Sequence, residues 1–196
     1  MSFASPGPPE RRLRITDPRA LRALAHPLRL ALLDHLMSFG PQTAAQCAAG
    51  VGSSPSNCSY HLRALARVGL VEAESSADRR ERPWRATSTG LEFGPRGPGS
   101  PAAAAAAHAV EDLSLARDEE LTRHAWERHD EQPAEWRAAE TYHTYGLTLT
   151  PAELGELTAE LDRLVRPYIT LTRGDVPAEA GVVLLRLLAF RHPHTP

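Results

Sequence analysis

The sequence of 196 residues predicts a protein of the α+β class that is mostly α. In the first half, proline repeatedly follows a residue that can cap a helix, which is the pattern of a helix start. Between residues 70 and 88, two short strand-like segments flank a polar loop, which is the pattern of a β-hairpin. A run rich in glycine and proline, residues 94–101, separates this half from a second half that has its own helix signals.

The composition favours a cytoplasmic protein with a core of ordinary size. Hydrophobic residues make up 42% of the chain, yet no stretch approaches the roughly 18 apolar residues that a membrane span needs. The first ten residues, MSFASPGPPE, contain neither the basic nor the apolar region of a secretory signal. Two cysteines are too few for a disulfide scaffold, which favours a reducing compartment. We therefore expect no membrane partner.

Charge is distributed unevenly along the chain, and all 22 basic residues are arginine. Residues 1–95 contain twelve arginines and eight acidic residues, a net charge of +4. Residues 96–196 contain ten arginines and sixteen acidic residues, a net charge of −6. A mildly basic front half and an acidic back half suit a DNA-binding domain attached to a domain that does not contact DNA.

Composition also divides the chain into four parts. Residues 1–12 are rich in proline, glycine and serine and are predicted to be a disordered tail. Residues 13–93 carry the signals of a first domain, and residues 94–107 form a linker and the alanine-rich start of a helix. Residues 108–196 form a C-terminal domain.

Four helices are predicted in the first domain, and each begins at a capping residue: Asp17, His26, Thr43 and Ser54. Proline occupies the first helical position in all but the third of them. Thr43 and Gln46 have the spacing of a capping box. Gly40 is expected to end the second helix, and Gly69 lies at the end of the fourth.

The fourth helix has two chemically different faces. At 100° per residue, Cys58, Leu62 and Leu65 fall on one stripe that can pack on the preceding helices. A polar stripe lies opposite and contains Ser56, Tyr60, Arg63 and Arg67. Arginine pairs with guanine edges, and hydroxyl groups donate to phosphate oxygens, so the polar stripe suits DNA.

A basic hairpin is predicted directly after this helix. Residues 70–74 and 83–88 can pair as strands, and the loop between them carries three arginines. A polar-faced helix followed by such a hairpin is the order of a winged helix-turn-helix, whose wing reaches phosphates or the minor groove. We therefore expect a winged helix-turn-helix domain followed by a small α/β C-terminal extension. The predicted DNA-binding residues are Ser54, Ser56, Asn57, Ser59, Tyr60, Arg63, Arg67, Arg79, Arg80 and Arg82.

Three motifs in this domain resemble ArsR-type regulators, which are dimeric winged-helix repressors of bacteria. The motifs are His26-Pro27-Leu28-Arg29-Leu30, Ser59-Tyr60-His61-Leu62 and Gly69-Leu70-Val71. The resemblance covers roughly residues 17–90. It implies a homodimer that binds a palindromic operator, with the helix after the wing in the dimer interface.

The sequence predicts no metal site, no cofactor and no enzyme activity. Thiolate sensors of the ArsR type carry a C-x-C pair on the third helix, where this chain has only Cys47. Cys58 lies on the core stripe, so both cysteines are interpreted as small buried hydrophobic residues. His124 and His129 are five residues apart and diverge around a helix. We find no metal motif, nucleotide-binding glycine loop or nucleophile elbow.

The second half of the chain has fewer sequence patterns that predict helices or strands. Residues 108–131 are predicted to be a helix, and the aromatic-rich residues 134–149 are predicted to end as a strand. Thr150 and Glu153 form a capping box for a helix that continues to about Tyr168. Residues 182–190 are almost entirely apolar and are predicted to be a buried strand. Three roles stay open for this half: a dimerisation brace, an effector-sensing domain and a partner-docking surface.

These patterns lead to one functional prediction and two alternatives. We predict a sequence-specific transcriptional regulator, expected to be a repressor, that binds double-stranded DNA as a homodimer on an inverted repeat. An unidentified small-molecule effector is a further expected partner. The alternatives are a winged-helix module for protein interaction and a metal-responsive repressor.

Overall fold

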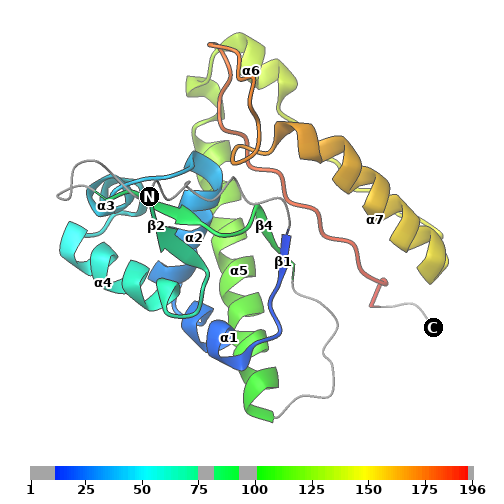
Figure 1. The fold of residues 1–196 in the computed structure, drawn as a ribbon. Helices are drawn as coiled ribbons and strands as arrows, with labels where there is room; N and C mark the ends of the chain where they lie inside the picture. Colours follow the sequence, from blue (N-terminus) through cyan, green and yellow to red (C-terminus); the bar gives the residue numbers. More distant parts are fainter. Residues whose placement is uncertain (1–11, 75–81, 93–100, 194–196) are drawn as a thin grey trace.

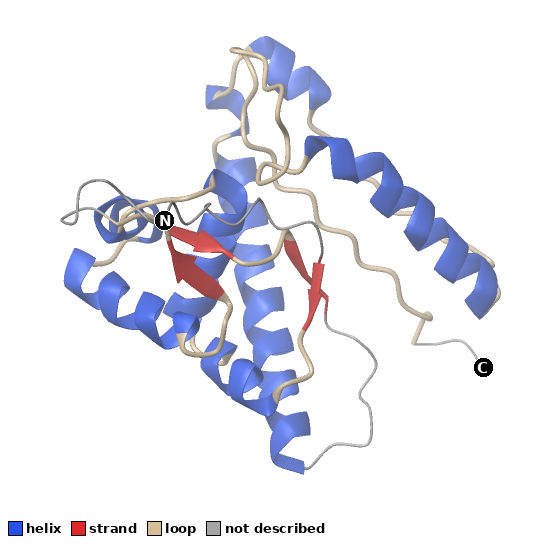
Figure 2. Cartoon of the chain, viewed as in Figure 1, coloured by secondary structure: helices blue, strands red, loops and turns tan. Residues whose placement is uncertain are grey.

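The computed structural model describes residues 12–74, 82–92 and 101–193. In its first part, helices pack together beside two small sheets (Figure 1; Figure 2). The helices there are α1 (Pro18–Leu24), α2 (Pro27–Phe39), α3 (Ala44–Val51), α4 (Pro55–Ala66) and α5 (Pro101–Glu127). The strands are β1 (Arg12–Arg14), β2 (Val71–Ala73), β3 (Trp84–Ala86) and β4 (Gly90–Glu92). The predicted fold class, α+β and mostly α, is confirmed.

The four predicted helix starts are confirmed, and side chains cap each of them. Asp17 accepts a hydrogen bond from the backbone N–H of Arg19 at 2.8 Å, and Nδ1 of His26 accepts one from Leu28 at 3.2 Å. Both halves of the capping box at the start of α3 are formed. Ser54 accepts from the backbone N–H of Asn57 at 3.2 Å. Each cap satisfies an N–H that would otherwise lack a partner.

The core of the first part is formed mainly by leucine side chains from α1, α2 and α4. Those that are completely buried are Leu24, Leu32, Leu33, Leu36, Leu62 and Leu65. The first turns of α5 complete this core, because Ala106 and Val110 are buried in it and α5 packs along α1. The helix that the sequence places after a linker therefore begins as part of the first domain's core.

The predicted hairpin is confirmed, and the structure adds a second strand pair. β2 and β3 are antiparallel, with Val71 opposite Ala86. Gln42 extends this pair, since it exchanges two backbone hydrogen bonds with Trp84 at 2.9 and 2.7 Å. β1 pairs with β4 in parallel, and Arg12 lies opposite Gly90. That pairing was not predicted, because each strand is only three residues long and carries no strand pattern.

The second half differs from the prediction. Its helical elements are η1 (His129–Glu131), α6 (Ala134–Ala139), α7 (Pro151–Val165) and η2 (Arg166–Tyr168), and the capping box of α7 is formed. The predicted strands at the end of residues 134–149 and at 182–190 are wrong, since both segments lie exposed and outside any strand. Neither segment pairs with a described strand. No described residue after Val110 is buried.

None of the helices within the described ranges is both long enough and apolar enough to span a membrane.

Candidate nucleic-acid interface

The two faces predicted for α4 are present in the structure. Cys58, Leu62 and Leu65 have no solvent-exposed surface and pack into the core. On the opposite side, Tyr60 is 61% exposed. The other members of the polar stripe are also exposed: Ser56, Arg63 and Arg67. The stripe therefore presents a phenol and two guanidinium groups to solvent from one helix face, which suits base edges and phosphates.

The start of α4 carries a small network of hydroxyl and amide groups. The Oγ atoms of Ser54 and Ser56 are 3.2 Å apart. The amide of Asn57 donates to Oγ of Ser53 at 3.1 Å. Ser54, Ser56 and Asn57 are exposed, whereas Ser59 is half-buried. Such groups at a helix N-terminus, where the backbone N–H groups carry partial positive charge, favour an anion such as phosphate.

The turn after α4 ties the helix to the hairpin. Gly69 has φ 73°, a left-handed conformation that side chains other than glycine rarely adopt. Its carbonyl accepts a hydrogen bond from Oγ1 of Thr87 at 2.7 Å, and the backbone N–H of Thr87 donates to the carbonyl of Leu70 at 3.2 Å. These bonds hold the end of α4 against the hairpin.

The wing is described only at its base. Arg79 and Arg80 lie outside the described residues, and Arg82 is exposed just before β3. Arg85 has a different role, which was not predicted from the sequence. It lies opposite Glu72 in the hairpin, its side chain is only 9% exposed, and it forms an ion pair with that carboxylate. The sequence could have indicated this role, because opposite charges at facing positions of two strands favour their pairing. The ion pair therefore helps to fix the register of the hairpin.

A second feature that was not predicted is a contact between two histidines beneath α4. His61 is 8% exposed, and its ring centroid lies 4.5 Å from that of His26 at the start of α2. Helical spacing places His61 about 60° from Cys58, so its buried position could have been predicted. Burial, and to a lesser degree the neighbouring His26 and Arg29, lowers the pKa of His61. Burial and Arg29 likewise lower the pKa of His26.

We expect the protein to lose stability as the pH falls below about 6.5, the ordinary pKa of histidine. Both histidine pKa values are lowered in the folded state, so the unfolded chain binds protons that the folded chain does not. The stability that the neutral pair contributes is therefore complete above that pH and decreases as the pH falls towards the folded-state pKa values. The free energy of urea unfolding, measured between pH 8 and pH 5.5, tests this.

The matched variants are His61→Phe, which keeps a ring but cannot titrate, and His108→Gln, which replaces an exposed histidine on α5. The first should flatten the decrease in stability, and the second should leave it unchanged. A decrease of equal size in all three proteins would mean that other groups cause it.

The two cysteines are buried in the α3–α4 region, as predicted. Burial raises the pKa of Cys47 to about 11 and also raises the pKa of Cys58. Both thiols are therefore protonated at neutral pH, the form that is poor at binding metals and at nucleophilic attack. Across the described part of the chain, no three His, Cys, Asp or Glu side chains are placed to hold a metal ion.

A match to a protein-family model agrees with this arrangement. Residues 24–74, about a quarter of the chain, match a family model described as a helix-turn-helix domain. One similar solved structure is the homodimeric winged helix-turn-helix DNA-binding domain, fragment 1–100, of a possible ArsR-family transcriptional regulator from Mycobacterium bovis. It is 25% identical, with a TM-score of 0.33, and the match covers 54% of this chain and 81% of that one. No curated protein matches.

The capped helices, the exposed polar face of α4 and the adjoining hairpin define a winged helix-turn-helix domain. Among proteins with such a domain, the first half of the chain resembles the ArsR type in its three motifs.

Proposed function

We propose that this chain is a transcriptional repressor that binds an inverted-repeat operator as a homodimer. The observation that carries the proposal is the exposed polar stripe of α4, which lies opposite a fully buried apolar stripe. An amphipathic surface helix of no particular function would not need two arginines and a tyrosine on its solvent face beside a basic hairpin. Helix-turn-helix proteins usually bind DNA as two copies whose recognition helices lie about one DNA turn, roughly 34 Å, apart.

Within this proposal the predicted residues have two roles. Four residues of α4 enter the major groove, and Arg63 is the residue best suited to a bidentate contact with guanine. They are Ser56, Asn57, Tyr60 and Arg63, with Ser54 and Ser59 at the flanks of the groove. The remaining arginines contact phosphates and position the helix: Arg67, Arg79, Arg80 and Arg82. The acidic second half faces away from the DNA.

A selection from random duplexes tests the proposal. Purified protein should enrich one inverted-repeat sequence from a library of random duplexes, and the enriched duplex should bind at least about a thousandfold more tightly than a scrambled one at physiological salt. The complex should contain two chains per duplex. Binding that does not distinguish the enriched duplex from the scrambled one would contradict the proposal and favour the protein-interaction alternative.

The wing arginines should act mainly on affinity and little on sequence preference. Replacing both Arg79 and Arg80 with alanine should weaken binding to the selected duplex and to a scrambled one by nearly the same factor. The slope of log affinity against log salt should also become shallower by about 0.9 for each arginine–phosphate pair that the substitutions remove. Titrations from about 50 to 200 mM salt measure both effects. Weaker binding to the selected duplex alone would mean that the wing reads sequence.

Sensing of a small-molecule effector by residues 108–196 stays a prediction.

A further inference from the structure

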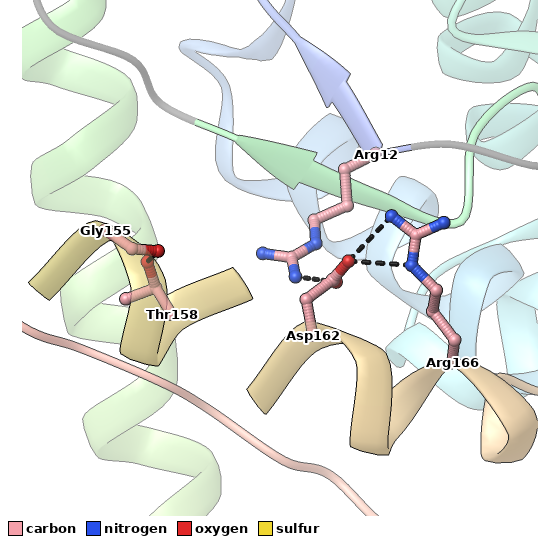
Figure 3. A network of polar contacts seen from close by, with 5 residues as sticks. All are labelled: Arg12, Gly155, Thr158, Asp162 and Arg166. Atoms are coloured by element: carbon pink, nitrogen blue, oxygen red, sulfur yellow. Dashed lines mark hydrogen bonds and ion pairs between the residues drawn. The ribbon is translucent and has the colours of Figure 1, made fainter. Parts of the chain in front are cut away.

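The polar contacts that join different parts of the chain differ in how far they are buried. Asp162 on α7, for example, forms an ion pair with Arg12 of β1 and another, at 2.7 Å, with Arg166 (Figure 3). Both arginines are well exposed, so these pairs contribute little to stability. The contact between His26 and His61 is different, because His61 is buried beneath α4. A charge placed on that ring loses most of the stabilisation that water gives to a charge at the surface.

His26 caps α2 with a nitrogen that has to stay unprotonated. Its Nδ1 accepts a hydrogen bond from the backbone N–H of Leu28 at 3.2 Å, so the neutral ring carries its proton on Nε2. A second proton therefore binds at Nδ1, where it abolishes the cap. The charge then lies at the start of a helix, where the backbone dipoles disfavour a cation. Protonation of His26 thus weakens the first turn of α2.

His61 on α4 is equally unsuited to a proton. Its ring centroid lies 4.5 Å from that of His26 and 5.1 Å from that of Tyr60, which it meets edge-on. Its Nδ1 is buried, and no described residue forms a hydrogen bond with that atom. An imidazolium carries an N–H at both nitrogens, so protonation leaves a buried donor without an acceptor among the described residues.

The charged surroundings of the two rings also oppose protonation. Besides burial, Arg29 on the first turn of α2 lowers the pKa of both rings. The other titratable side chains on the elements that pack most closely against α4 are Arg19 and Arg22 of α1, Asp34 and His35 of α2, Cys47 of α3 and Glu72 of β2. The two carboxylates among them already pair with arginines, Asp34 with Arg117 and Glu72 with Arg85. Protonated rings are therefore repelled by Arg29 and by each other.

We propose that the His26–His61 pair is a proton-operated switch of operator binding. In the neutral state the pair holds α4 against the start of α2, and protonation separates the two rings and displaces α4. Tyr60, which contacts His61, and Arg63, two residues further along the helix, then lose their positions for the major groove. Exposed arginines still attract the DNA backbone, so the switch acts on sequence-specific binding. The inference rests on the proposed function, since it regulates the helix that reads the operator.

Affinity of the full-length protein for two duplexes at falling pH tests the switch. At constant salt, affinity for the selected inverted repeat should fall at least about threefold between pH 7.5 and pH 5.5, because protein with a displaced α4 binds protons that the complex does not. Affinity for the scrambled duplex should stay level or rise, since falling pH adds positive charge and arginine stays charged. Fluorescence anisotropy of labelled duplexes measures both affinities, and far-UV circular dichroism shows at each pH whether the protein is folded.

Two variants at the pair and one control separate it from the other histidines. His26→Asn keeps a side chain that caps helices and does not titrate in this range, and His61→Phe keeps a ring without a titrating nitrogen. Each should bind the selected duplex with nearly constant affinity from pH 7.5 to pH 5.5, whatever its affinity at pH 7.5. His108→Gln, which removes an exposed histidine of α5, should show the same decrease as the unmodified protein.

Four results would overturn the switch. In the unmodified protein they are a parallel fall in affinity for both duplexes, unfolding within this pH range, and an affinity for the selected duplex that does not fall. In the variants the result is a folded His26→Asn or His61→Phe protein that retains the whole decrease. The proposed function fails by a different result, namely equal affinity for the selected and the scrambled duplex at pH 7.5.

Discussion

Replacing Arg63 with alanine should weaken binding to the selected operator by about 1–3 kcal/mol, or roughly five- to 150-fold. Arg63 is exposed on α4, on the side opposite the buried Cys58, Leu62 and Leu65. A guanidinium in that position can donate two parallel hydrogen bonds to O6 and N7 of guanine, and alanine can donate none. Because the side chain contributes nothing to the core, the free energy of unfolding should change by less than about 0.5 kcal/mol.

The weakening should depend on the sequence of the duplex. Base-by-base substitution of the operator should show that one base pair no longer contributes to binding by Arg63→Ala. Arg123→Ala, which removes an exposed arginine from α5, is the matched control and should bind as the unmodified protein does. Equal affinity and equal base preference in both variants would show that Arg63 does not contact a base.

A chain that ends at Glu92 should be less stable by about 3–5 kcal/mol than one that ends at Glu127. The shorter chain lacks Ala106 and Val110, which are buried in the core, and it uncovers the face of α1 along which α5 packs. A difference of this size lowers the melting temperature by roughly 10–20 °C or more for a domain of this length. Thermal and urea unfolding of the two truncated chains measure the difference directly.

The longer truncated chain is also informative about the second half. No described residue beyond Val110 is buried, so the chain ending at Glu127 should fold as a stable single copy even though it lacks the last 69 residues. Val110→Ala in that chain should reproduce part of the destabilisation, about 1 kcal/mol or somewhat more. If the chain ending at Glu127 unfolds as readily as the one ending at Glu92, residues 128–196 stabilise the first domain in a way that burial does not show.

Much of the first domain could be predicted because its signals are local. A helix start depends on two or three neighbouring residues, as at Asp17 and Ser54, and the structure places a cap at each of them. The division of α4 into two faces depends only on helical spacing, and burial follows it. The candidate DNA-binding residues on that helix could therefore be chosen from the sequence alone.

Features that depend on residues far apart in the chain could not be predicted. The β1–β4 pair joins segments separated by more than about seventy residues, and neither segment has a strand pattern of its own. The ion pairs of Arg186 join it to Asp34 on α2 and Asp118 on α5, two helices far apart from it in the chain. Residues 182–190 were predicted to be a buried strand because they are almost entirely apolar. An apolar composition does not specify which part of the structure would pack against the segment, and in the structure it lies exposed.

The length of α5 has a mechanical consequence. The helix comprises 27 residues, which at 1.5 Å each make a rod about 40 Å long. Its first turns are held beside α1 in the core, and Arg117 pairs with Asp34 of α2 farther along, at 3.0 Å. The ten residues after Arg117 extend about 15 Å towards the elements of the second half (Figure 1), so a tilt of about 10° would move the end of the helix by about 3 Å. A displacement of the second half would therefore reach α2, which packs against α4, through this one helix.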